Sequence, residues 1–476
     1  MMTLQRRDSP GKKNKTFQRI AAVLILSSGF ALAVMAVPRK EEQPLQETAL
    51  QLLKKGLAEQ GAFTLLRKLT AVGPRLTGSP QAATAVELMQ REMQDLGFDS
   101  VRLEPTTVGR WIRGDKEEGR IVSQRFGDIP VPVCALGGSM ATPEEGITAG
   151  VLEVRSIEEL KQAGEKAKAK IIFFNRAMNP AFLDTFQSYG EVARLRFEGA
   201  VEAARAGGAA ALIRSLTLEI NDSPHTGNMA HDPGLPQVPA VAIATRGADR
   251  LSEILRNEPE VKFHFRTSCR SLPPVTSHNV IGEIRGSEKP EEIILIGGHL
   301  DSWDLSPGAH DDGSGCSQSV EALRLIKELG LKPRRTIRAV LFMDEENGGT
   351  GGRDYARSEN RKKEINRLAM ESDRGGFLPL GFSVSGPSGV VERLQKIAPL
   401  FEPLGLNWIR PGGGGVDIDP LAASGTVLIG LVPDSQRYFE VHHSALDVLE
   451  KVNPRELELG AVAMAFLAYI IAQEGI

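Results

Sequence analysis

The chain has 476 residues, of which 41% are hydrophobic and 25% are charged, and its formal net charge is -3. This length exceeds what one hydrophobic core usually supports, so two folded units are expected. The composition is that of an ordinary globular protein. The nearly balanced charge argues against nucleic acid or an anionic membrane as a partner.

The N-terminal segment has the pattern of an export signal. Basic side chains among residues 6–19 precede an apolar run at 20–37, and small residues around Ala36 offer a cleavage site. We expect residues 1–36 to be a signal peptide that is removed, which makes the remaining chain secreted or periplasmic. The alternative is an uncleaved membrane anchor, because an apolar run of roughly 18 residues is near the minimum for a span.

The next segment is predicted to be helical. Residues 37–47 are charged and polar and are expected to form a linker or a short propeptide. Between residues 48 and 103, leucines recur at three- and four-residue spacing, which predicts helices. One of these helices is expected at 83–96, with Gly97 as its stop. Residues 48–106 would form the first part of a domain that resumes later in the chain.

Residues 107–271 have a different sequence pattern from the segment before them. Short β-like runs alternate with Gly/Pro turns and with an alanine-rich helix at 200–206. The runs lie at 131–133, 150–154, 170–174, 210–213 and 240–243. Few candidate metal ligands occur here in tight spacing. We therefore expect a separate β-rich domain inserted into the first one.

Residues 272–476 alternate between apolar runs and helical patterns. The apolar runs lie at 293–296, 337–343, 368–370 and 427–431. Helices are expected at 317–329, and at 454–473 with Asn453 as cap. This alternation predicts an α/β fold with a mixed, mainly parallel sheet sandwiched by helices. Ligands bind such sheets beyond the carboxyl ends of the strands.

Two of the eight histidines are predicted metal ligands, His299 and His443. Asp301 follows His299 by two residues, so its carboxylate could accept the second ring N–H and fix the tautomer. His443 lies in a loop expected to return to the sheet edge. Ordinary surface or hydrogen-bonded core roles are expected for three others: His231, His264 and His278.

Carboxylates at the ends of the apolar runs complete the pattern. Asp311 and Asp312 are adjacent in a Gly-rich loop; a simple turn would use such residues too, but we expect one of them to bridge two metals. Glu345 and Glu346 follow an apolar run, where one can bind metal while the other faces a water. Asp373 follows the next run. Imidazoles mixed with carboxylates suit two divalent cations, zinc above all, and indicate a metallohydrolase.

The chain resembles peptidase family M28, the co-catalytic zinc aminopeptidases and carboxypeptidases, over nearly all of its length after the signal. The resembling segments are residues 143–149, 199–205, 223–227, 298–304 and 442–444. The resemblance implies a zinc-exopeptidase-like fold, with a protease-associated domain at 107–271 that roofs the cleft. It implies catalytic-domain parts at 48–106 and 272–476, and a homodimer.

The resemblance also assigns roles to the site residues. It implies two zinc ions that share one carboxylate, with ligands His299, Asp311 and Asp373 for one ion and Asp311, Glu346 and His443 for the other. Glu345 becomes the general base while a metal-bridging hydroxide attacks the peptide carbonyl. His442 is proposed to hydrogen-bond the oxyanion, with a surface or supporting role as the alternative. Asp301 is placed behind the ligands.

The sequence has three further features of interest: a glycine-rich segment, His225 and the cysteines. Residues 412–417 contain four glycines, but no Lys-Ser/Thr pair follows, so a mobile loop at the substrate cleft is favoured over a phosphate cradle. His225 is expected to serve a structural turn, with a cleft contact as the alternative. Three cysteines, Cys134, Cys269 and Cys316, are too few for a disulfide framework. One disulfide of unassigned pairing and three reduced thiols both stay open.

The leading hypothesis is a secreted or periplasmic zinc exopeptidase that acts on dipeptides or short peptides. It would touch a membrane only if the N-terminal segment stays uncleaved. One alternative is a catalytically inactive binding ectodomain, against which the complete ligand set with Glu345 argues. The other is a single-zinc aminoacyl cyclase, against which the presence of both His299 and Asp373 argues. The sequence does not decide which peptide terminus must be free.

Overall fold

The computed structural model describes residues 43–406 and 408–476, so the expected signal peptide lies outside the described residues. Helix α1 (Gln43–Glu59) begins inside the segment expected to be a linker. Pro44 lies in its first turn, where the missing N–H costs nothing. The three cysteines are all buried and free, which answers the open question of a disulfide.

Helices α2 (Gly61–Thr70) and α3 (Pro80–Asp95) follow, and the Ser79 side chain caps α3. The expectation of helical structure up to residue 103 was wrong at its end, because strand β1 (Ser100–Ile112) begins there. Gly97, at a φ of 68°, ends the helical run. The partner of β1 is β10 (Arg270–Ile284), which comes after all strands of the second sheet in the sequence. A local pattern of apolar residues cannot identify a strand partner that is so remote.

The first sheet has eight strands in the order β1-β10-β12-β11-β13-β16-β14-β15. The further strands are β11 (Lys289–His299), β12 (Arg335–Phe342), β13 (Ile365–Glu371), β14 (Pro379–Ser385), β15 (Trp408–Pro411) and β16 (Val427–Pro433). The neighbours β12, β11, β13 and β16 run parallel, and so do β14 and β15. Antiparallel pairs join β1 to β10, β10 to β12 and β14 to β16. The predicted α/β fold with a mixed sheet is confirmed.

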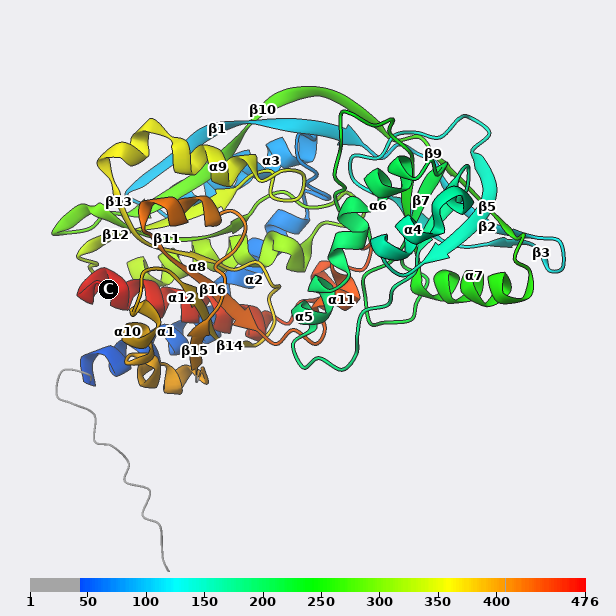
Figure 1. Ribbon diagram of the computed structural model, residues 1–476. Coiled ribbons are helices and arrows are strands. Elements are labelled where there is room, and N and C mark those ends of the chain that lie inside the picture. Colours follow the sequence, from blue (N-terminus) through cyan, green and yellow to red (C-terminus); the bar gives the residue numbers. More distant parts are fainter. Residues whose placement is uncertain (1–42, 407) are drawn as a thin grey trace, which may run out of the picture. The chain divides into compact units, whose positions relative to one another are not determined.

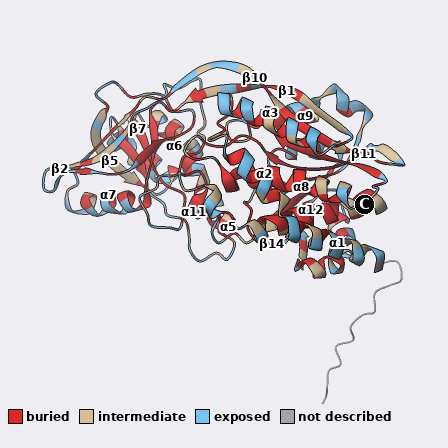
Figure 2. Ribbon diagram, turned by 180° about the vertical axis from the view of Figure 1, so that it is seen from behind, coloured by how far each residue is buried: buried red, intermediate tan, exposed pale blue. Residues whose placement is uncertain are grey.

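Helices cover both faces of this sheet. Side chains of a strand alternate between the two faces, so neighbouring residues pack against helices on opposite sides. Ile294 and Ile296 pack with α8 (Ser314–Glu328) and α12 (Pro454–Glu474) in one cluster. Leu295 packs on the opposite face with Tyr355 of α9 (Thr350–Arg357). Figure 1 shows α12 beside α8, and Figure 2 shows how much of both helices is buried. Two short helices complete this part: α10 (Val390–Gln395) and α11 (Tyr438–Val441).

Helix α12 is long and apolar enough to cross a membrane by length and composition alone. It is 78% buried over its most apolar window and packs in the largest hydrophobic cluster. Its composition is therefore that of a core helix of this sheet.

A second eight-stranded sheet has the order β3-β2-β9-β5-β6-β7-β8-β4. Its strands are β2 (Glu117–Ser123), β3 (Gly127–Pro130), β4 (Val133–Ala135), β5 (Ile147–Val154), β6 (Ile171–Phe174), β7 (Ala210–Arg214), β8 (Ala240–Ile243) and β9 (Lys262–Thr267). Its helices are α4 (Ile157–Ala163), α5 (Thr185–Gly190), α6 (Ala193–Arg205) and α7 (Thr245–Asn257). Because β1 and β10 flank this segment and belong to the first sheet, we propose an inserted domain, with 107–271 as its approximate bounds.

Candidate metal centre

The candidate ligands lie where the parallel strands of the first sheet end. His299 is the last residue of β11, and Glu345 and Glu346 follow β12. Asp373 lies just after β13, and His443 follows α11 in the connection after β16. Carboxyl ends of adjacent parallel strands meet at one edge of a sheet, so these side chains converge although they are distant in sequence.

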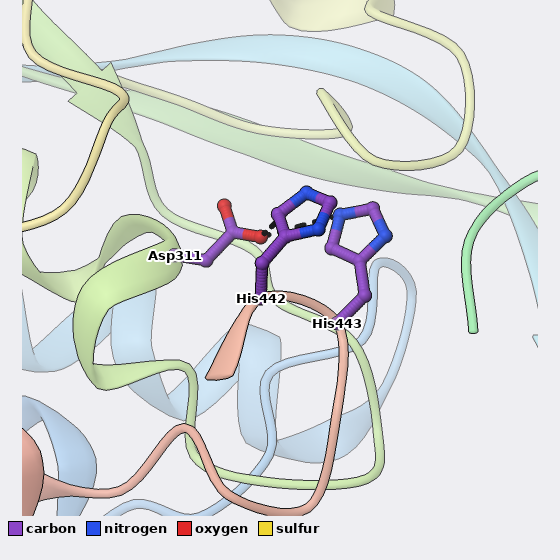
Figure 3. A group of neighbouring side chains, drawn as sticks. All are labelled: Asp311, His442 and His443. Atoms are coloured by element: carbon purple, nitrogen blue, oxygen red, sulfur yellow. Dashed lines mark ion pairs between the residues drawn. The ribbon is translucent and has the colours of Figure 1, made fainter. Parts of the chain in front are cut away.

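Asp311 lies between two groups of donors. Its Oδ1 is 3.3 Å from His299 Nε2, and its Oδ2 is 3.2 Å from His443 Nε2. His299 Nε2 is also 3.4 Å from Asp373 Oδ1, and His443 Nε2 is 3.1 Å from Glu346 Oε2. Figure 3 shows Asp311 directed at the imidazole of His443 and at its neighbour His442. The structure thus gathers all five predicted ligands into two groups that share Asp311.

The neighbouring carboxylate Asp312 has a different task. It accepts the backbone N–H of His299 at 3.0 Å and that of Gly315 at 2.9 Å. These bonds tie the end of β11 to the first turn of α8. Asp312 therefore fixes the backbone of a donor residue, while Asp311 is the member of the pair whose carboxylate faces both groups.

Asp301 acts differently from the sequence expectation. Its carboxylate lies 3.8 Å from His299 Nδ1, whereas its backbone carbonyl lies 3.1 Å from that nitrogen and accepts the ring N–H. The carboxylate accepts the backbone N–H groups of Asp344, Glu345 and Glu346 at 2.7, 3.2 and 3.3 Å. It was expected to orient His299, but it holds the turn that carries the two glutamates.

The donor set fits zinc. Two donors each ~2.1 Å from a tetrahedral zinc lie ~3.4 Å apart, close to the 3.1–3.4 Å measured between the paired imidazole and carboxylate atoms. Asp311 Oδ2 and Glu346 Oε1 are buried without a hydrogen-bond partner, which is costly unless a cation satisfies them. Three carboxylates also offset most of the charge of two Zn²⁺ ions.

The imidazole pKa values point the same way. Burial lowers the pKa of His443, but Glu346 and Asp311 outweigh burial and raise it to about 10. Burial likewise opposes the charge on His299, whose pKa Asp311 and Asp373 nevertheless raise well above its usual value. A proton held between imidazole and carboxylate occupies the place that a metal ion takes when it binds.

Both donor groups open into one cleft of 770 Å³, which Glu345 and His442 also line. Burial raises the pKa of Glu345 well above its usual value, and His299 only partly opposes this. His442 stacks on His443 with ring centroids 3.6 Å apart, and its Nε2 lies 3.7 Å from Asp311 Oδ2. Burial and the neighbouring His443 lower the pKa of His442 far below its usual value, so its ring is neutral.

The inserted segment reaches His443. The backbone N–H of Thr226 donates to the His443 carbonyl at 2.8 Å, and His443 Nδ1 lies 3.3 Å from the Thr226 carbonyl. These contacts hold His443 at a φ of 59°, a backbone conformation that is unfavourable for a residue other than glycine. His225 does not line the cleft; it is buried, and neither ring nitrogen has a hydrogen-bond partner.

Two residues that hold the backbone near the candidate ligands were not predicted from the sequence. The Asp447 carboxylate accepts the backbone N–H of His310 at 2.7 Å and that of Asp311 at 3.0 Å, and so holds the shared ligand. Arg75 is fully buried and donates to the carbonyl oxygens of Leu300 and Gly308 at 2.7 and 3.2 Å. Asp447 had a weak signal, four residues after His443, whereas Arg75 lies in a loop far from every motif.

The glycine-rich loop is anchored as well as close to the cleft. Val416 lines the cleft. The Gly412 N–H donates to the Val384 carbonyl at 2.9 Å, and the Ile418 N–H donates to Glu371 at 3.2 Å. A Cβ on Gly415 would lie 2.3 Å from the Glu371 carboxylate. The glycine at that position lets the backbone pack closely against the Glu371 side chain. The expectation of a mobile loop did not foresee this packed contact.

Comparisons with known proteins agree with this geometry. The model of Peptidase family M28 matches residues 279–468. Carboxypeptidase Q of Bos taurus is 34% identical over 467 residues, which cover 96% of this chain and 97% of the relative. Carboxypeptidase Q of Homo sapiens is 33% identical, covering 94% of this chain and 95% of the relative.

Solved structures give the same result. A peptidase M28 precursor from Shewanella amazonensis SB2B has a TM-score of 0.87 and 34% identity, covering 91% of this chain and 98% of that one. A zinc aminopeptidase from Bacillus subtilis, at 23% identity, shares the fold, with a TM-score of 0.61 over 86% of this chain and 94% of that one. From this likeness along nearly the whole sequence, the chain belongs to peptidase family M28.

Proposed function

We propose that the chain is a zinc-dependent exopeptidase that hydrolyses dipeptides or short peptides. The observation that carries the proposal is the position of Asp311, whose two carboxylate oxygens face one imidazole each, at 3.3 and 3.2 Å. Paired sites that share a carboxylate are suited to hydrolysis with two metal ions. The cleft of 770 Å³ above them accommodates a short peptide.

In this proposal, His299, Asp311 and Asp373 hold one zinc ion, and Asp311, Glu346 and His443 hold the other. When bound, the ions supply Lewis-acid chemistry that lowers the pKa of water and polarises a carbonyl oxygen. Glu345 accepts the proton of the attacking water and returns it to the leaving amine. Its buried position keeps it basic enough for this exchange, because burial raises its pKa.

His442 is assigned to the oxyanion. Its neutral ring carries one N–H, and its Nδ1 is buried without a hydrogen-bond partner. It lines the cleft beside Asp311. An N–H donor at this place can bond the oxygen that becomes negative during attack. The same closeness to Asp311 and His443 would let it serve as a metal donor, and the zinc content of a His442 variant separates the two roles.

A panel of dipeptides with free, N-blocked and C-blocked termini tests the proposal. Hydrolysis is expected with zinc, should cease with a chelator, and should return when zinc is added back. Protein that carries two zinc ions and cleaves no peptide would refute the peptidase assignment. A stoichiometry of one zinc ion would instead support the aminoacyl cyclase.

The compartment and assembly are part of the proposal. The basic and apolar pattern of residues 6–37 supports export, with cleavage after Ala36. The inserted domain at 107–271 would roof the cleft and limit substrate length, consistent with lining residues such as Tyr189 and Met229. A homodimer follows from the family resemblance and is testable by light scattering.

A further inference from the structure

A second pocket lies in the inserted segment, at the carboxyl ends of adjacent parallel strands. Strands β5, β6, β7 and β8 are neighbours in that order and run parallel. The pocket is lined by Arg155 directly after β5, Asn175 directly after β6, Arg214 at the end of β7, and side chains of α7, which follows β8. Ligands of open α/β sheets bind at this edge, as the metal donors of the first sheet do. The pocket has a volume of 1130 Å³ and shares no lining residue with the cleft at the metal centre.

This pocket is strongly basic, although the whole chain has a net charge of -3. Its charged lining residues are six arginines and three carboxylates: Arg155, Arg176, Arg214, Arg246, Arg250 and Arg256, with Glu159, Asp249 and Glu253. Carboxylates pair with Arg176, Arg214 and Arg246. The other three arginines have no carboxylate within ion-pair distance in the part of the chain that the structure describes. An excess of three positive charges in one hollow attracts anions.

Arg214 is the buried arginine of this group, with only 5% of its surface exposed. Its two hydrogen bonds both leave from Nη1, to Asp249 at 2.6 Å and to Asn175 at 3.2 Å. Nε is buried and has no hydrogen-bond partner, which is costly for a charged donor. Nε and Nη2 form the side of the guanidinium that can donate two parallel hydrogen bonds to one oxyanion. The structure leaves that side of Arg214 for a ligand.

The lining residues also limit the kind of anion that fits. None of those described is aromatic, so the base of a nucleotide would find no side chain on which to stack. The apolar members are only Ala177 and Ile220, which favours a polar ligand. Guanidinium groups match the geometry of phosphate and related oxyanions. Six of them around one hollow suit a ligand that carries more than one such group.

We propose that this pocket binds a compact small molecule with two or more phosphate or sulfate groups. Arg214 is the buried anchor, and the unpaired Arg155, Arg250 and Arg256 are further donors. The inference goes beyond the proposed function and does not rest on it, because neither the metal donors nor Glu345 line this pocket.

Calorimetric titration of the zinc-loaded protein tests the proposal. The probes are fructose 1,6-bisphosphate and myo-inositol hexasulfate, with fructose as the uncharged comparison. We expect saturable binding of one anion per chain and no binding of fructose. The affinity should fall as the NaCl concentration rises, because salt screens charges that face solvent. Tighter binding of the bisphosphate identifies phosphate as the preferred group, and tighter binding of the hexasulfate identifies sulfate.

Three single variants locate the bound anion. Arg214→Met removes the buried anchor and should raise Kd roughly 10- to 100-fold, as for loss of charge-assisted hydrogen bonds. Arg250→Ala removes an exposed arginine of the pocket and should raise Kd roughly 2- to 5-fold, as for an exposed ion pair. Arg125→Ala is the matched control. Arg125 is exposed, lies in the same inserted segment between β2 and β3, and does not line the pocket, so Kd should not change.

The outcomes that would overturn the proposal are distinct. A wild-type protein that binds neither anion at low salt refutes it. An unchanged Kd in both Arg214→Met and Arg250→Ala would place the anion elsewhere, for example at the zinc ions. Equal weakening by Arg250→Ala and Arg125→Ala would show only general attraction to a basic surface. If Arg214→Met fails to fold, the comparison of the two exposed variants still decides.

Discussion

Glu345 and Glu346 are sequence neighbours with separate tasks. Both backbone N–H groups donate to Asp301, which fixes the turn after β12. The Glu346 carboxylate faces His443 at 3.1 Å. Glu345 lines the cleft and has no ion-pair contact with an imidazole among the described side chains. One carboxylate is therefore held for the metal, and the other stays available for a proton.

Replacing Glu345 should affect catalysis without affecting metal binding. Glu345→Gln keeps the size of the side chain but cannot accept a proton. We expect kcat to fall roughly 10²- to 10⁴-fold, with zinc content unchanged. Steady-state kinetics beside metal analysis checks this. The general-base role is wrong if the variant turns over at a near-normal rate.

Substitution at His442 distinguishes an oxyanion donor from a ligand. His442→Phe preserves the ring stack on His443 but removes the N–H. We expect kcat to fall by roughly 10²-fold, as for loss of one oxyanion donor, while two zinc ions stay bound. Retention of full activity would leave His442 with a packing role, and loss of one zinc equivalent would make it a ligand.

At the scale of elements, the connection between β15 and β16 contains glycines in two different environments, one open and one closely packed. Gly413 and Gly415 lie two residues apart in it. A Cβ on Gly413 meets nothing within 4 Å, whereas a Cβ on Gly415 would lie 2.3 Å from the Glu371 carboxylate. Glu371 is nearly fully buried and belongs to β13, the strand that leads to Asp373.

This contrast gives a matched pair of variants. Gly415→Ala should destabilise the protein by about 1–3 kcal/mol, the usual cost of overpacking. Gly413→Ala should change stability by less than about 0.5 kcal/mol. Chemical denaturation followed by fluorescence measures both. Equal stability of the two variants would show that the loop yields freely, as a mobile loop would.

Much of the arrangement of strands and metal donors could be predicted from the sequence. The apolar runs before His299, Glu345 and Asp373 are strands β11, β12 and β13, and their order placed these donors at one sheet edge. Local patterns failed where the partner is remote: β1 was predicted partly as helix, and β10 was not predicted as a strand. Periodicity reports how a segment is buried, not which strand pairs with it.

The supporting contacts were beyond sequence reasoning for a related reason. Asp301 is near His299 in sequence, yet its carboxylate bonds the turn after β12. Thr226 and Arg196 reach His443 from the inserted segment. Such contacts depend on how two sheets meet, and a spacing rule contains no information about that.

At the scale of the whole molecule, zinc binding should depend on pH. Without zinc, the pKa of His443 is raised to about 10, above the usual value of 6.5. The protonated imidazole therefore stabilises the zinc-free fold fully below pH 6.5, and this stabilisation is lost as pH rises through about 10. Zinc requires the unprotonated imidazole, so it must displace a proton below that range.

We accordingly expect zinc affinity to rise between pH 6 and pH 8. At a fixed free zinc concentration, the increase in Tm on zinc addition should be larger at pH 8, because stabilisation grows with the ratio of zinc concentration to Kd. Differential scanning calorimetry in a zinc buffer measures this. An increase in Tm that is the same at both pH values would show that zinc binding displaces no protons from these imidazoles.

A crystal structure of the zinc-loaded protein, with anomalous scattering recorded at the zinc edge, tests the central claim most directly. The account predicts two zinc peaks ~3.5–4 Å apart, one against His299 and Asp373 and one against Glu346 and His443, with Asp311 between them. A single peak, or zinc bound elsewhere while these five side chains face apart, would contradict it.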